Sequence, residues 1–135
     1  MDINIATALI GIGAGAFGYW FTTFSMQPIL RYRNIRNKVH RDFIYYAQVV
    51  DASGLNDEMQ ALYRERVLSN RDSSARLFAA FLELPWWYRN YLENTGCNPE
   101  EAARHLIGFS NTTDYDASHT LEQAIRKKLG LPTET

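Results

Sequence analysis

The 135-residue sequence contains a single cysteine, Cys97, so the chain cannot form an internal disulfide. One free thiol suits a reducing compartment such as the cytoplasm. The cysteine and the three histidines show no pair at the close spacing of a zinc site. The sequence also has no Gly-x-Ser-x-Gly nucleophile elbow, and its glycines do not follow a strand as a phosphate-binding loop requires. We therefore expect no metal site and no cofactor, and an enzyme is the less favoured class.

Alternating apolar and polar runs bounded by hairpin turns are missing as well. Apolar residues instead recur at steps of three and four, the period of an amphipathic helix. One such stripe follows the first thirty residues, and three or four shorter helical patterns follow residue 56. A polar run at 69–74 is either an exposed stretch of one long helix or a break between two. These patterns predict an all-α protein, in which the first stripe is Tyr32, Ile35, Val39, Phe43, Tyr46 and Val50.

Charge is missing from Ile3 to Leu30, a run of 28 residues between Asp2 and Arg31. A helix needs about 20 apolar residues to cross the hydrocarbon core of a bilayer. A buried core helix would need a larger domain around it than the remaining residues can supply. A cleaved signal peptide would carry its basic residues before the apolar run, whereas here they follow it. The run therefore predicts an uncleaved transmembrane helix.

Basic residues are concentrated directly after this run, where segment 31–41 carries a net charge of +5. The positive-inside rule then places the N-terminus outside and the rest of the chain in the cytoplasm, and we expect a bacterial inner membrane. Residues 42–135 carry nine bases and fourteen acids, which argues against broad nucleic-acid binding. The basic residues are predicted to contact anionic lipid headgroups, and they are Arg31, Arg33, Arg36, Lys38 and Arg41.

Small residues recur at every third or fourth position within the uncharged run, at Thr7, Gly11, Gly15 and Gly18. Positions four apart share one face of a helix, and a row of small residues lets a second backbone approach closely in lipid. The row is similar to the glycine zippers of oligomeric membrane proteins and channels. It predicts a packing face for a homo-oligomer.

Arg33 and Asn34 precede His40 at a spacing that resembles the R-x4–6-H signature of HEPN-type ribonucleases. Some membrane-anchored accessory proteins of RNA-targeting CRISPR systems are similar in pairing a span with a degenerate motif of this kind. The resemblance implies a helical dimer that cleaves RNA without metal, with His40 as the acid or base and Arg33 on the phosphate. The alternative for the same bases is the lipid-facing collar.

The most aromatic stretch of the soluble part follows Pro85 and contains Trp86, Trp87 and Tyr88. Consecutive tryptophans cannot both face one core from a helix, so at least one is expected to contact lipid or a partner protein.

Three segments follow from these patterns: a transmembrane anchor at 1–30, a basic juxtamembrane amphipathic helix at 31–52, and a cytoplasmic helical domain at 53–135. The leading hypothesis for function is a homo-oligomeric membrane assembly, a scaffold or a pore, that presents this domain to the cytoplasm. The alternatives are the HEPN-like nuclease in antiviral defence and an accessory subunit of a larger membrane complex.

Overall fold

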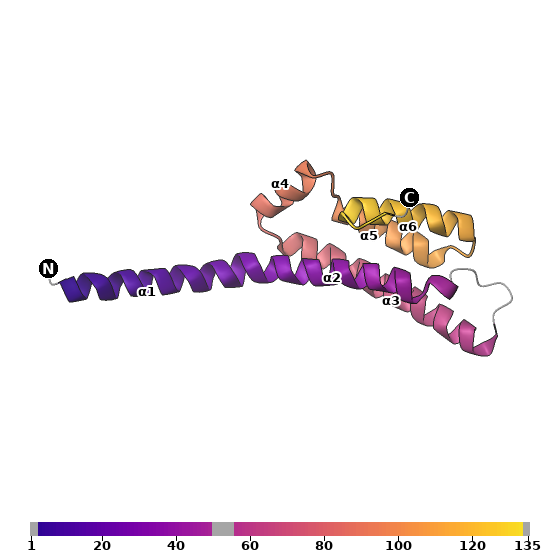
Figure 1. Ribbon diagram of the computed structural model, residues 1–135, viewed down its shortest axis with the longest axis horizontal. Helices are drawn as coiled ribbons and strands as arrows, with labels where there is room; N and C mark the ends of the chain where they lie inside the picture. Colours follow the sequence, from indigo (N-terminus) through magenta and orange to yellow (C-terminus); the bar gives the residue numbers. More distant parts are fainter. Residues whose placement is uncertain (1–2, 50–55, 134–135) are drawn as a thin grey trace.

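The computed structural model describes residues 3–49 and 56–133, and it confirms the all-α prediction: over these ranges the chain forms helices and no strand. A long helical rod projects from a small helical bundle (Figure 1). The elements in chain order are α1 (Ile3–Phe21), a π-helical segment (Thr22–Met26), α2 (Gln27–Tyr45), a 3-10 turn (Ala47–Val49), α3 (Asp57–Glu83), α4 (Trp86–Asn94), α5 (Pro99–Asn111) and α6 (Tyr115–Leu129).

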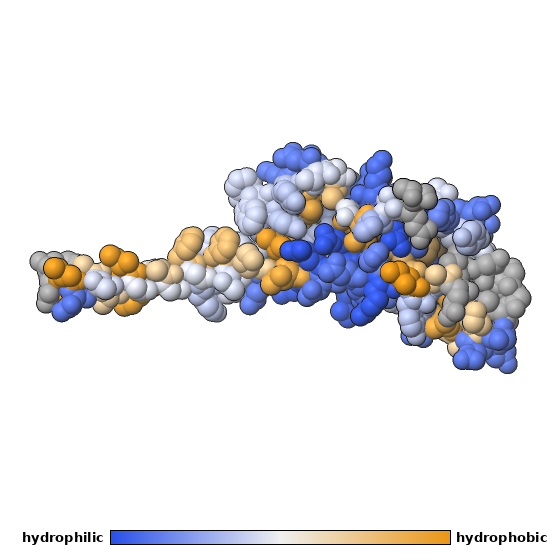
Figure 2. Space-filling model, viewed as in Figure 1, coloured by the Kyte–Doolittle hydropathy of each residue, from blue (hydrophilic) through white to orange (hydrophobic). Residues whose placement is uncertain are grey.

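The rod is one continuous helix from Ile3 to Tyr45, and its N-terminal part is long and apolar enough to cross a membrane. α1 contains no buried residue, so it is not the core helix of the bundle. Its 19 residues span about 28 Å at 1.5 Å per residue, close to the roughly 30 Å of a hydrocarbon core. Figure 2 shows mostly apolar and weakly polar residues along the rod, whereas strongly hydrophilic residues are concentrated on the bundle.

Pro28 neither ends the helix nor restarts it. A proline lacks the backbone N–H that would bond four residues back. The chain accommodates it through the widened π-helical turn just upstream, in which the N–H of Gln27 donates to the carbonyl of Thr22. Segments of this kind add a residue to a helical turn without interrupting the helix. α2 therefore continues α1 directly into the bundle.

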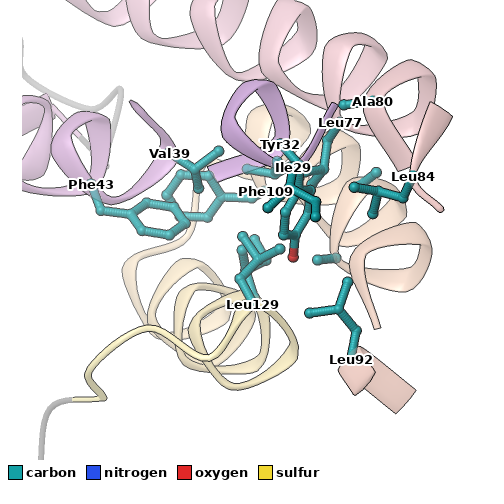
Figure 3. Packing of buried hydrophobic residues seen from close by; sticks show 14 residues of the cluster. Ile29, Tyr32, Val39, Phe43, Leu77, Ala80, Leu84, Leu92, Phe109 and Leu129 are labelled. Carbon is teal, nitrogen blue, oxygen red and sulfur yellow. The ribbon is translucent and has the colours of Figure 1, made fainter. Parts of the chain in front are cut away.

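The apolar stripe of α2 lies in the core, as its spacing predicts. Tyr32, Val39, Phe43 and Tyr46 are buried and Ile35 is half-buried, while Val50 lies outside the described residues. Phe43 meets Phe109 of α5 edge to face, with 5.3 Å between ring centroids. Figure 3 shows these side chains converging between the helices. The buried cluster comprises Ile29, Tyr32, Val39, Phe43, Leu77, Ala80, Leu84, Leu92, Ala102, Ala103, Leu106, Phe109, Ile125 and Leu129.

α3 runs unbroken through the polar stretch at 69–74, and half of that stretch is buried rather than exposed. Ser74 packs against α5, where its hydroxyl donates to the carbonyl of Ala103 at 2.7 Å. Small side chains on both helices allow this close approach, because Ser73, Ala102 and Ala103 leave no bulk between the backbones. The polar residues of α3 thus form a helix interface instead of a solvated face.

Capping residues set several of the helix ends. Asn56 caps α3 by accepting from the N–H of Met59 at 2.8 Å, and Asn98 caps α5 ahead of Pro99. Gly130 ends α6 with φ of 70°, a left-handed conformation that favours glycine. The last helix begins at Tyr115.

Candidate functional site

The small-residue row of α1 lies on an open surface. A Cβ added at Gly11, Gly15 or Gly18 would meet nothing within 4 Å. Thr7 uses its hydroxyl on its own helix, donating to the carbonyl of Ile3 at 2.9 Å, so it presents no free donor to a neighbour. The row therefore offers backbone and small side chains only, and van der Waals packing is the interaction available to it.

Two of the five basic residues that follow the uncharged run are engaged by α3. Arg31 forms an ion pair with Glu83. Lys38 donates to Asp42 at 3.1 Å and to the hydroxyls of Ser69 and Ser73 at 2.9 Å each. An ammonium has three N–H donors, so all three of Lys38 have acceptors inside the interface. Lys38 is therefore a structural contact between α2 and α3 in addition to being part of the predicted collar.

Arg33 and Arg36 line a cavity of about 660 Å³ between α2, α4 and the C-terminal end of α6. The volume falls within the range of small-ligand sites. Neither arginine has an acidic partner among the described residues, and the Nε atom of Arg36 is buried without a hydrogen bond. The remaining lining residues are Trp87, Tyr88, Tyr91, Leu92, Thr95, Cys97, Leu129 and Gly130.

His40 contacts Arg126 of α6 and has different surroundings from Arg33. Its Nδ1 lies 2.9 Å from Nη1 of Arg126. A guanidinium can only donate, so Nδ1 of His40 is the acceptor in this contact. Arg126 is itself buried, stacking over Phe43 at 5.1 Å and donating to the carbonyl of Pro132. Within one chain the structure therefore does not bring Arg33 and His40 together.

The aromatic residues of α4 divide between solvent and core. Trp86 and Trp87 are exposed, with 75% and 41% of their surface accessible. Tyr88 is half-buried and meets Tyr32 edge to face at 6.2 Å between centroids. Burial raises the pKa of Tyr88, and it raises the pKa of Tyr32 well above the ordinary range. α4 lies at the end of the bundle from which α1 projects (Figure 1).

Buried polar residues of α3 were not identified from the sequence. Arg66 is only 1% exposed, and none of its three guanidinium nitrogens has a hydrogen-bond partner among the described residues. It stacks between Tyr63 and Phe109, at 5.1 and 4.8 Å from the ring centroids. Burial lowers its pKa. In a sequence, a buried arginine in a helix cannot be distinguished from a solvent-exposed one by residue type. Only the register of Arg66 with the apolar positions of the helix could have indicated its burial.

In the part of the chain that is described, no three His, Cys, Asp or Glu side chains are grouped so that they could hold a metal ion. Cys97 has no disulfide partner and borders the cavity. Comparison with protein-family models, curated proteins and solved structures finds no match to this chain. The two arrangements that stand out are the uncovered face of α1 and the cationic, aromatic end of the bundle beside it.

Proposed function

We propose that this chain is a single-pass membrane protein that assembles with copies of itself through α1. The assembly is a scaffold or a pore, and it presents the helical bundle to the cytoplasm. The observation that carries the proposal is the exposure of α1. Every large apolar side chain on this helix is open to its surroundings. A soluble monomer rarely exposes so long an apolar surface, and a bilayer would cover it on all sides.

The match in length supports this placement. α1 covers the hydrocarbon core, and the full uncharged run of 28 residues extends about 42 Å. That equals the roughly 40–45 Å of a bilayer with its headgroups, so Arg31 would emerge at the edge of the headgroup layer. The basic residues that follow lie only on this side of the span, which favours a cytoplasmic bundle.

Assembly through α1 is supported by the open small-residue row. Helices in lipid gain nothing from burying apolar surface against each other, so close backbone packing has to drive their association. No atom of the described residues lies within 4 Å of a Cβ added at Gly11 or Gly15, so residues 3–49 and 56–133 do not cover this face. A second copy of α1 is the partner whose shape fits it. The nuclease alternative is less well supported, because Nδ1 of His40 already accepts a hydrogen bond from Arg126.

Replacing Gly11 or Gly15 with leucine tests the proposal. Leucine inserts favourably in membranes, so Gly11→Leu and Gly15→Leu should still span, but the added side chain would separate the backbones. We expect both variants to shift the detergent-solubilised particle to lower mass in light scattering. The matched controls are Ile10→Leu and Ile12→Leu, which lie off the row and should leave the mass unchanged.

The same samples separate the possible roles. If the assembly is a pore, liposomes that contain the wild-type protein should leak ions and the two glycine variants should not; a scaffold should leak in neither case. A wild-type particle that is already monomeric would contradict self-assembly and favour an accessory subunit of a larger complex. An oligomer whose mass is unchanged in both glycine variants would move the contact away from α1.

A further inference from the structure

The cavity beside Arg33 carries positive charge without compensation. Three other cations of the bundle have carboxylate partners: Arg31 has Glu83, Lys38 has Asp42, and Arg104 has Glu100. The lining of the cavity contains two arginines and no acidic residue. Guanidinium groups favour the planar, bidentate geometry of carboxylates and phosphates. The site is therefore built to accept an anion.

A buried hydroxyl lies behind residues that line this cavity. Tyr32 is completely buried, and its hydroxyl has no hydrogen-bond partner among the described residues. Figure 3 shows the oxygen on the side of the core that faces Leu92 and Leu129, and both of these residues line the cavity. A buried polar group without a partner is rare in a folded protein and requires an explanation. A ligand that enters between the arginines would supply an acceptor for this O–H.

Helix carbonyls around the cavity do not oppose the binding of an anion. α4 and α6 both end there, and exposed carbonyls at helix C-termini would repel an anion. In this structure they are already engaged: Thr95 and Cys97 donate to the last carbonyls of α4, and Asn98 and Gly130 donate to those of α6. The electrostatic character of the cavity is thus set mainly by the arginines.

The position along the rod fits an origin of the anion in the bilayer. Arg33 and Arg36 follow Leu30 by three and six residues, or about 5 and 9 Å along the helix. Long arginine side chains reach such distances toward an interface. Trp87 and Tyr91 on the facing wall are of the residue types that favour the headgroup layer.

We propose that the cavity lined by Arg33 and Arg36, with the hydroxyl of Tyr32 behind its wall, binds the phosphate group of an anionic lipid headgroup. The inference rests on the proposed membrane placement and adds to it one specific site in place of a diffuse basic collar. The two guanidinium groups donate hydrogen bonds to the phosphate, and the Tyr32 hydroxyl donates to one of its oxygens. The aromatic rings flank the glycerol and the start of the acyl chains. A soluble phosphate compound would use the same groups, so the test must separate the two sources.

Native mass spectrometry of the full-length protein can measure the lipid that it retains. The protein is reconstituted in nanodiscs of phosphatidylcholine with phosphatidylglycerol, extracted in mild detergent, and scored for retained phosphatidylglycerol. A charge-assisted hydrogen bond contributes about 1.5–3 kcal/mol, which corresponds to a factor of about 10 or more. We expect Arg33→Gln with Arg36→Gln to lower retention at least about tenfold. Arg64→Gln, an exposed charge at the far end of the bundle, is the matched control and should not change it.

Tyr32→Phe provides a second variant that removes a single buried oxygen and keeps the ring. A hydrogen bond to a charged phosphate oxygen corresponds to a factor of about 10 or more, so we expect retention to fall about tenfold. Tryptophan fluorescence of Trp86 and Trp87 verifies that each variant is folded. Retention at the wild-type level in Tyr32→Phe, or in the double arginine variant, would overturn the site.

Two further outcomes would overturn the lipid site, one in favour of a delocalised basic collar and one in favour of a soluble anion. Loss of retention in Arg41→Gln as large as in the double arginine variant would show a delocalised collar and overturn the cavity. Displacement of phosphatidylglycerol by excess inorganic phosphate, with no preference over phosphatidylcholine, would assign the site to a soluble ligand and also overturn the lipid proposal. Extraction of the wild-type protein by alkaline carbonate is scored separately, because it would contradict the membrane placement itself.

Discussion

Lys38 provides a sharp test of how the bundle is held together, because its sequence position predicts a lipid contact and its surroundings show a helix contact. Replacing it with methionine keeps the length of the side chain and removes the charge. The Asp42 carboxylate would then lose its only ion-pair partner among the described residues and keep one hydrogen bond, from the hydroxyl of Ser69 at 2.7 Å. Ser73 would lose its contact as well.

The size of the effect follows from the burial of the two partners. Breaking a fully buried pair destabilises by about 3–5 kcal/mol, whereas an exposed pair contributes about 0–1 kcal/mol. The Asp42 side chain is 8% exposed and that of Lys38 is 29% exposed, which places this pair between the two limits. We therefore expect Lys38→Met to lower the free energy of unfolding of the bundle by about 2 kcal/mol, or roughly 30-fold in the unfolding equilibrium.

Urea unfolding of the detergent-solubilised protein, followed by tryptophan fluorescence, measures the effect. Arg41→Met is the matched control, since Arg41 is exposed and its loss should change stability by no more than about 0.5 kcal/mol. Combining Lys38→Met with Asp42→Leu should recover part of the loss, because no unpaired charge then stays buried. Equal stability of Lys38→Met and Arg41→Met would refute the structural role and return Lys38 to the collar.

Two other predictions concern topology and pH. A reporter fused after Thr135 should be active only in its cytoplasmic form, and periplasmic activity would reverse the proposed orientation. Burial, reinforced by the hydrogen bond to Glu65, raises the pKa of Tyr46 to about 12. Folding therefore favours the neutral phenol. The contribution of Tyr46 to the free energy of unfolding is complete below pH 10 and is lost as the pH rises from 10 to 12. Urea unfolding over this range should show a steeper loss of stability in the wild type than in Tyr46→Phe, and equal slopes would contradict the assignment.

Local sequence patterns were sufficient to predict the helices and the buried apolar stripe of α2. The uncharged run and the steps of three and four at Tyr32, Val39 and Phe43 each depend on neighbouring residues only, so a sequence displays them directly. Caps such as Asn56 and Asn98 are local in the same way. The polar run at 69–74 could not be interpreted locally, because its burial depends on Lys38 and Ala103, which lie on other helices.

The candidate site depends on contacts between distant parts of the chain. The sequence predicts Arg33 as a headgroup contact and, separately, Trp87 as a partner or lipid contact. Only the fold brings them to one cavity, since more than fifty residues separate them. His40 is engaged by Arg126, 86 residues away, which no motif spacing reveals. Residues that act by facing another helix were therefore the ones that local patterns could not assign.

The π-helical segment links the two proposals through geometry. Gly15 and Arg33 are 18 residues apart, which is five full turns of a regular α-helix and would place them on the same face. The widened turn at Thr22–Met26 lies between them and adds one residue to the helical repeat, which rotates everything after it by about 100° relative to α1. A copy packed on the glycine row would therefore not lie directly above the cavity. Because the helix is continuous from Ile3 to Tyr45, this rotation is fixed within each copy, and the proposed self-assembly through α1 would not place a second α1 directly over the arginine side of α2.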